Sequence, residues 1–132
     1  MPLKPELNLS GYRGIWGESL TEDLVKNFAH AFGLFTKEDT GKDNPTILVG
    51  RDGRESGPLI KDILIPQLLS QGINIVYGDV MPTPTTLFSV RNHKWDGAII
   101  ITASHNPIIY NGLKFVSKKG LFINKEETEK VK

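Results

Sequence analysis

The fold is decided by the stretch from Gly97 to Thr102, which reads GAIIIT. Three consecutive isoleucines without polar alternation predict a strand that is buried on both faces. A second apolar run of this kind spans Thr46 to Val49 and ends at Gly50, and a third spans Ile73 to Tyr77. Helical patterns separate the runs. We therefore expect an α/β fold, a three-layer α/β/α sandwich with a mixed, mostly parallel sheet.

Each expected helix begins at a residue that can cap free backbone N–H groups. The expected caps are Thr21, Ser56 and Thr83. The first helix is expected to end before a polar loop over 37–44, the second at Gly72, and the third near Asn92. Proline at position 66 conflicts with the second helix, because an interior proline costs about 3 kcal/mol. We expect a bent helix there.

The last third of the chain contains two further signals. Asn111-Gly112 is a dipeptide typical of tight turns, and Leu113 to Val116 is expected to follow it as an antiparallel strand. Lys125 to Lys132 resembles the start of a helix without a cap and with one apolar residue, Val131. A helix that stops before it buries a face indicates that the chain is a piece of a longer protein.

Composition excludes several classes of protein. The 132 residues have a net charge of +1, with 16 basic and 15 acidic side chains, whereas nucleic-acid binding usually needs a clustered basic excess. There is no cysteine, so disulfides and thiolate metal sites are excluded. No apolar run is long enough for a membrane span, and residues 1–6 lack the apolar core of a signal peptide. We expect a cytoplasmic protein.

Polar residues follow two of the predicted strands directly. Arg51 to Arg54 follows the strand at 46–49, and Ala103 to Pro107 follows the strand at 97–102. In open α/β sheets, ligands bind at the carboxyl ends of the strands. We therefore expect four side chains of these loops on a shared rim: Arg51, Arg54, Ser104 and His105. The paired N–H donors of an arginine guanidinium group, and backbone N–H groups beside glycine, can bind an anion such as phosphate.

The stretch from Thr102 to Pro107, TASHNP, with Tyr110-Asn111-Gly112 and Lys114, resembles the phosphoserine loop of the α-D-phosphohexomutases. Three other stretches are similar to further landmarks of that family's first domain, in the expected order: Gly11 to Gly14, Val49 to Ser56, and Pro82 to Pro84. The resemblance covers nearly the whole chain. It implies that residues 1–132 are domain I of a four-domain phosphoglucomutase or phosphomannomutase.

The resemblance also implies the chemistry. Such enzymes keep a phosphate on a serine, here Ser104, and transfer it to a sugar phosphate, which gives a bisphosphorylated intermediate that returns its other phosphate. Arg13, His105 and Lys114 match positions beside the phosphoserine, and Lys114 is the preferred proton carrier, aided by Arg13 or His105. Expected phosphate-binding residues are Arg13, Arg51, Arg54 and Asn106.

The same resemblance implies a Mg²⁺ cofactor, bound here only through the phosphate oxygen of Ser104, and a sugar 1,6-bisphosphate activator. The aspartate-rich metal loop and the sugar-recognition loop of the family have no counterpart in this chain. The expected partners are therefore a hexose phosphate and the remaining domains of the same polypeptide, without nucleic acid or membrane. We expect residues 1–132 alone to be inactive.

Several alternatives stay open. The main one is a non-catalytic module that binds phosphosugars without a phosphoserine, and a weaker one is a fragment with no ligand. Ser104 alone could cap a turn, and the adjacent His105 does not make it a hydrolase serine, because no G-x-S-x-G motif is present. Arg51 and Arg54 could brace their loop through Asp52, and Lys114 could be a solvated edge lysine.

The sugar substrate also stays open. Threonine at position 102 favours the hexose enzymes over phosphoglucosamine mutase, where the resemblance would place serine.

Overall fold

The computed structural model describes residues 11–103 and 110–131 of the chain. Four helices and five strands alternate along it. In chain order they are β1 (Tyr12–Ile15), α1 (Glu22–Thr40), β2 (Thr46–Arg51), α2 (Gly57–Ser70), β3 (Asn74–Val80), α3 (Thr83–His93), β4 (Gly97–Ile101), β5 (Tyr110–Val116) and α4 (Lys125–Val131).

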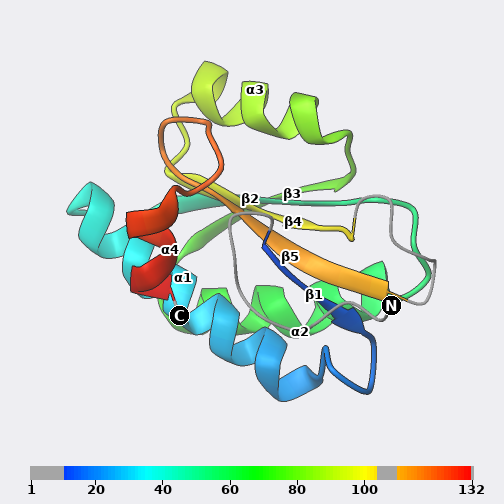
Figure 1. Ribbon diagram of the computed structural model, residues 1–132. Coiled ribbons are helices and arrows are strands. Elements are labelled where there is room, and N and C mark those ends of the chain that lie inside the picture. Colours follow the sequence, from blue (N-terminus) through cyan, green and yellow to red (C-terminus); the bar gives the residue numbers. More distant parts are fainter. Residues whose placement is uncertain (1–10, 104–109, 132) are drawn as a thin grey trace.

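The five strands form one sheet in the order β1-β5-β4-β2-β3. Strand β2 pairs in parallel with both β3 and β4, whereas β5 pairs antiparallel with β4 and with β1. Four strands therefore point the same way and β5 runs against them. The predicted α/β class and mixed, mostly parallel sheet are confirmed. Figure 1 shows the sheet between α3 on one side and α1 and α2 on the other.

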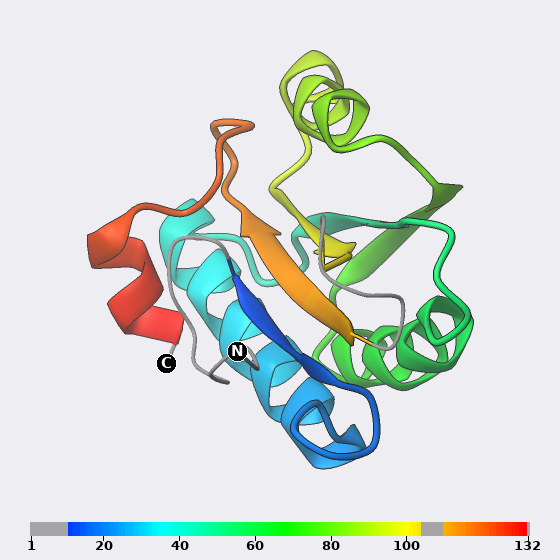
Figure 2. The ribbon, with the colours of Figure 1, turned by 45° about the vertical axis from the view of Figure 1, so that its right-hand side comes forward.

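The two faces of the sheet carry cores of different size. The larger core lies under α1, α2 and α4, and includes Phe32, Leu64 and Phe115. The smaller core lies under α3 and is built around Leu48, Val90 and Ile100. Helix α3 packs on β4 and β2, and Figure 2 shows β5 and β1 lying against α1. On this face of the sheet, α3 therefore lies over β2 and β4 and not over β1 and β5.

Helix α1 begins as the sequence predicts. The Thr21 hydroxyl accepts a hydrogen bond from the Leu24 N–H at 3.3 Å, and Gly41 ends the helix with a φ of 71°. The helix extends to Thr40, so the loop predicted over residues 37–44 starts too early. Lys37 explains the difference, because its ammonium group donates to the Gln71 carbonyl at 2.5 Å and ties the last turn of α1 to the end of α2.

Helix α2 corrects one expectation. Ser56 is the N-cap residue, but its side chain makes no capping bond and instead accepts a hydrogen bond from Asn111. The helix continues through Pro66 to Ser70. Leu64 and Leu68, on either side of the proline, are fully buried, and this packing offsets the lost backbone bond. Gly72, with a φ of 79°, follows the helix as predicted.

Helix α3 starts one residue earlier than predicted. Pro82 is the N-cap and makes no side-chain bond, so Thr83 is the first helical residue and not the cap. Pro84 lies within the first turn, where a missing N–H has no cost.

The predicted turn at Asn111-Gly112 is wrong. Both residues lie inside β5, where Gly112 pairs with Arg13 and Asn111 pairs with Gly14 of β1. A side chain at Gly112 would clash with the Tyr12 carbonyl oxygen, so glycine permits the close approach of β1 to β5. The antiparallel direction predicted for this strand is confirmed.

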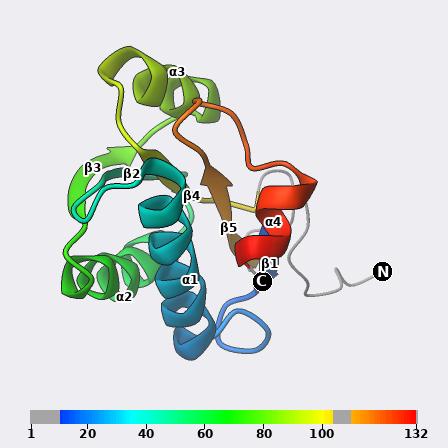
Figure 3. The same ribbon diagram turned by 90° about the vertical axis from the view of Figure 1, so that its left-hand side faces the viewer.

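The C-terminal helix α4 has a cap that the sequence analysis missed. The Asn124 side chain accepts from the Glu127 N–H at 2.8 Å, and the Glu127 carboxylate accepts from the Asn124 N–H at 2.9 Å. This reciprocal pair is a capping box. Val131 is 1% exposed, and Figure 3 shows α4 beside α1. None of the helices described is long and apolar enough to cross a bilayer.

Candidate functional site

The two polar segments predicted to share a rim leave the sheet side by side. Strands β2 and β4 are parallel neighbours, with Arg51 opposite Ile101. Beyond this pair, the Asp52 N–H donates to the Ile101 carbonyl at 3.1 Å. The Thr102 hydroxyl then donates to the Asp52 carboxylate at 2.7 Å. The end of β4 is therefore fastened to the segment that follows β2.

The same segment also holds the start of β5. The Arg54 guanidinium donates through Nη1 to the Tyr110 carbonyl at 3.0 Å and through Nε to the Asp52 carboxylate at 3.1 Å. The Asn111 amide donates to the Ser56 hydroxyl at 2.8 Å. Arg54 and Asn111 are both buried, at 7% and 0% exposure. Their bonds join parts of the chain that are 55 or 56 residues apart.

Ser104, His105 and Asn106 lie outside the described residues. The described residues on either side of this segment are buried: Thr102 and Ala103 precede it, and Tyr110 follows it. Because Ile101 pairs with Leu113, both ends belong to the same edge of the sheet.

Arg13 and Lys114 share one face of the sheet close to this edge. Lys114 lies opposite Ile100 of β4, and Arg13 lies opposite Gly112 of β5. Directly opposed residues point to the same face, and so do residues two apart on a strand. Ile100 packs under α3, so Arg13 and Lys114 both project from the face of the α3 side, over β1 and β5.

The electrostatics of this pair suit an anion. Burial lowers the pKa of the Lys114 ammonium, and the positive charge of Arg13 lowers it further. The Lys114 nitrogen lies 5.4 Å from the centre of the Phe122 ring. Arg13 Nε is buried and has no hydrogen-bond partner among the described residues. A buried N–H donor without a partner is unfavourable, and the two neighbouring positive charges favour an anion on this face.

Arg51 lies apart from Arg13 and Lys114. It is opposite Ile101, on the other face of the sheet, and its guanidinium binds the Asp79 carboxylate through Nη2 at 2.9 Å. Its Nε also contacts the Tyr77 hydroxyl at 3.0 Å. Asp79 has a positive φ of 60°, which is uncommon outside glycine. Arg51 thus braces the end of β3, while Arg54 braces its own loop and β5.

The described residues, 11–103 and 110–131, contain no group of three His, Cys, Asp or Glu side chains that could hold a metal. Asp52 is an acidic residue of the segment that follows β2. Its carboxylate oxygens accept hydrogen bonds from Arg54 and Thr102. A Mg²⁺ ion needs several oxygen ligands, so the described part of the chain does not supply a complete site.

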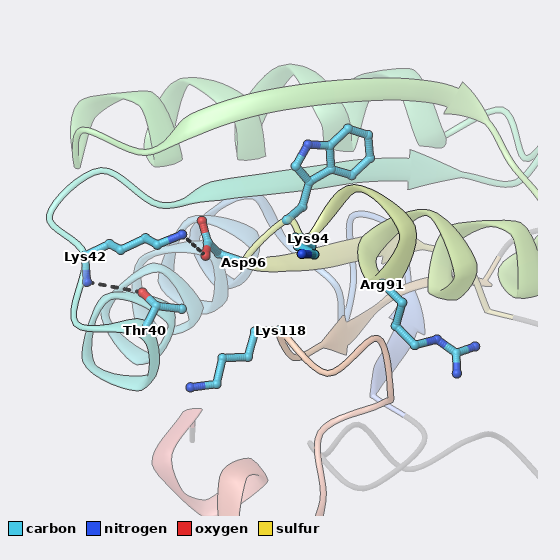
Figure 4. Close-up of a pocket in the computed structure, with 7 residues that line it drawn as sticks. Thr40, Lys42, Arg91, Lys94, Asp96 and Lys118 are labelled. Atoms are coloured by element: carbon cyan, nitrogen blue, oxygen red, sulfur yellow. Dashed lines mark hydrogen bonds and ion pairs between the residues drawn. The ribbon is translucent and has the colours of Figure 1, made fainter.

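A separate pocket of about 330 Å³ lies at the opposite edge, where β2 and β4 begin. Figure 4 shows the ion pair at its centre, with Lys42 at 2.8 Å from the Asp96 carboxylate. Asp96 also accepts the Thr46 N–H at 2.7 Å, so it fastens the start of β2 to the start of β4. Lys94, Arg91 and Lys118 complete its basic lining.

The family model for phosphoglucomutase/phosphomannomutase, alpha/beta/alpha domain I, matches residues 4–132. This chain belongs to that family. A phosphoglucomutase/phosphomannomutase of Thermococcus kodakarensis is 40% identical over 88% of the chain. A phosphoglucosamine/phosphogalactosamine mutase of Sulfurisphaera tokodaii is 41% identical over 92% of the chain. The chain spans about a quarter of these relatives, 25% and 26% of their lengths.

Solved structures of the phosphoglucomutase/phosphomannomutase family have the same fold. A Thermus thermophilus structure described as a phosphomannomutase aligns with a TM-score of 0.87 and 30% identity, over 99% of this chain and 30% of its own. A family member from Burkholderia thailandensis aligns with a TM-score of 0.76 and 28% identity, over 96% of this chain and 30% of its own. The chain therefore has the fold of domain I of this family.

The bonds that join the rim are not predicted from the sequence. The sequence pattern indicates a helix cap for Ser56 and a turn for Asn111, yet the side chains of Thr102, Ser56 and Asn111 all bond to another segment of the chain. A carboxylate with an arginine two residues later, directly after a buried strand, was the available signal for a braced loop.

Proposed function

We propose that the protein containing this domain is an intramolecular phosphotransferase that interconverts hexose 1-phosphate and hexose 6-phosphate. Ser104 carries the transferable phosphate. The observation that carries the proposal is the pair Arg13 and Lys114, two cations on the α3 side of the sheet beside the edge where residues 104–109 join β4 and β5. The family of the chain supports the same activity.

The first transfer breaks the bond between phosphorus and the Ser104 oxygen and forms a bond to a hydroxyl oxygen of the sugar phosphate. The proton of that hydroxyl moves to Lys114 in its neutral form, which a lowered pKa favours, and passes on to the departing Ser104 oxygen, so that the serine leaves as a hydroxyl. Arg13, aided by His105, balances negative charge on the phosphoryl oxygens. The bisphosphorylated sugar turns in the site and returns its other phosphate to Ser104, with the proton steps reversed.

A Mg²⁺ ion would neutralise negative charge at the phosphate of Ser104. An oxygen of that phosphate would be the one metal ligand that this chain provides. The other ligands would come from the remaining domains; residues 11–103 and 110–131 hold no group of three His, Cys, Asp or Glu side chains suited to a metal. The remaining domains and a sugar 1,6-bisphosphate activator complete the system. We place the protein in the cytoplasm, where its sugar phosphate substrates occur.

The identity of the sugar is a separate proposal. We propose a glucose or mannose phosphate, although phosphoglucosamine mutases are also among the relatives, for example that of Clostridium novyi at 37% identity. Activity with glucosamine phosphate that exceeds activity with the hexose phosphates would overturn this choice and leave the phosphoserine mechanism intact.

Phosphate uptake tests the proposed function directly. The complete protein is incubated with a sugar 1,6-bisphosphate and its intact mass is measured. The wild type should gain one phosphate, and Ser104→Ala should gain none and lose turnover. Ser70→Ala, which removes an exposed serine at the end of α2, is the matched control and should behave as the wild type does. Binding of phosphosugar without any mass gain would instead establish the non-catalytic module.

A further inference from the structure

One short segment holds both ends of the chain that carries Ser104. The segment from Asp52 to Ser56 binds Thr102 on one side of residues 104–109, and Tyr110 and Asn111 on the other. These contacts lie beyond the β2–β4 ladder, whose backbone pairing ends at Arg51 and Ile101. These side chains are therefore not part of the β2–β4 backbone ladder, and they join the segment after β2 to the end of β4 and the start of β5.

The Asp52 carboxylate is the centre of the arrangement. One oxygen accepts from the Arg54 side chain at 3.1 Å and from the Thr102 hydroxyl at 2.7 Å, and the other accepts from the Arg54 N–H at 3.1 Å. Arg54 in turn donates to the Tyr110 carbonyl. The carboxylate thus links the residue two places before Ser104 to the residue six places after it.

We propose that Asp52, Arg54 and Thr102 form a positioning unit, which sets the location of the Ser104 hydroxyl relative to Arg13 and Lys114. This inference rests on the proposed function. None of the three residues needs to touch the sugar. In-line phosphoryl transfer depends on placement of the reacting oxygen, and a displacement of about 1 Å can cost roughly 100-fold in rate. Loosening the unit should therefore slow transfer more than it weakens substrate binding.

Thr102→Val tests the unit, because valine keeps the shape of threonine and removes the hydroxyl donor to Asp52. In the complete protein, phosphate uptake and kcat should fall by about 10-fold or more, with little change in KM. Thr102→Ser keeps the donor and should stay within about threefold of wild type. Thr36→Val is the control, since the buried Thr36 hydroxyl bonds only within α1, to the Phe32 carbonyl at 2.9 Å.

Amide hydrogen exchange of the peptide spanning 102–112 gives a readout that does not depend on catalysis. Exchange in this peptide should rise in Thr102→Val and not in Thr102→Ser or Thr36→Val. Unchanged exchange, or raised exchange with unchanged phosphate uptake, overturns the positioning unit. A wild-type protein that never takes up phosphate overturns the proposed function instead, whatever the exchange data show, so the two failures are distinguishable.

Discussion

At the scale of single residues, Lys114 combines two properties that are uncommon for a lysine on a strand. It lies partly buried on a face of the sheet that carries Arg13 as a second cation, and both features lower its pKa. Because this pKa is lower in the folded than in the unfolded chain, the charge of Lys114 opposes folding at neutral pH. The penalty fades as pH rises through the folded pKa towards 10.5.

Lys114→Arg in the complete protein separates charge from proton transfer. Arginine retains a positive charge but does not release its proton, so kcat/KM should fall by about 10²–10⁴-fold. In the wild type, kcat/KM should rise with pH as Lys114 loses its proton, and this rise should disappear in the variant. The measurement is a pH–rate profile of both proteins.

Lys118→Arg is the matched control for that profile. Lys118 follows β5 within four residues of Lys114 but faces the Asp39 carbonyl, to which its ammonium donates at 2.8 Å. Its replacement should leave the profile unchanged. A Lys114→Arg protein that keeps the wild-type pH dependence would assign the proton to another group.

At the scale of elements, α2 shows how packing overrides local preference. Pro66 cannot donate the backbone bond that an interior residue normally makes, yet the helix continues to Ser70. Pro66 itself is exposed, whereas Ile60, Leu64 and Leu68 are fully buried at spacings of four residues. The apolar face of the helix therefore decides where it ends.

Pro66→Ala should raise the free energy of unfolding by about 1–3 kcal/mol, since alanine restores a donor in the helix interior and the loss of chain stiffness takes back part of the gain. Thermal or urea unfolding measures the change. Pro58→Ala, in the first turn of the same helix, should change stability little, because N–H groups there have no helical partner. Equal effects at the two prolines would contradict this account of α2.

At the scale of the whole molecule, the two edges of the sheet differ in kind. The carboxyl edge of β2 and β4 has the braced segment from Asp52 to Ser56, with Arg13 and Lys114 nearby. The amino edge has the Lys42–Asp96 pair and the basic pocket. The candidate site therefore lies at the carboxyl edge of the sheet, in a chain that spans about a quarter of the length of its relatives.

Purified 1–132 should neither turn over hexose phosphates nor bind Mg²⁺ tightly, because one phosphate oxygen on Ser104 cannot complete an oxygen coordination shell. A coupled mutase assay and a calorimetric Mg²⁺ titration measure the two properties, with the complete protein as the positive control. Turnover by 1–132 at a rate near that of the complete protein would show that the domain is self-sufficient.

The amino-acid sequence by itself determined that β2 and β4 are buried, where α1 begins, and which loops lie at the carboxyl edge, because apolar runs and caps are local signals. The apolar run at 73–77 also predicted a buried strand, but this was wrong, because β3 is an edge strand with several exposed residues. The sequence did not reveal β1, the strand role of Asn111-Gly112, or the bonds from Thr102 to Asp52, from Arg54 to Tyr110 and from Asn111 to Ser56. Those bonds join residues 50 or more positions apart. Asn-Gly favours a turn in isolation, but the close passage of Tyr12 needs a glycine inside β5, and only tertiary packing brings Tyr12 there.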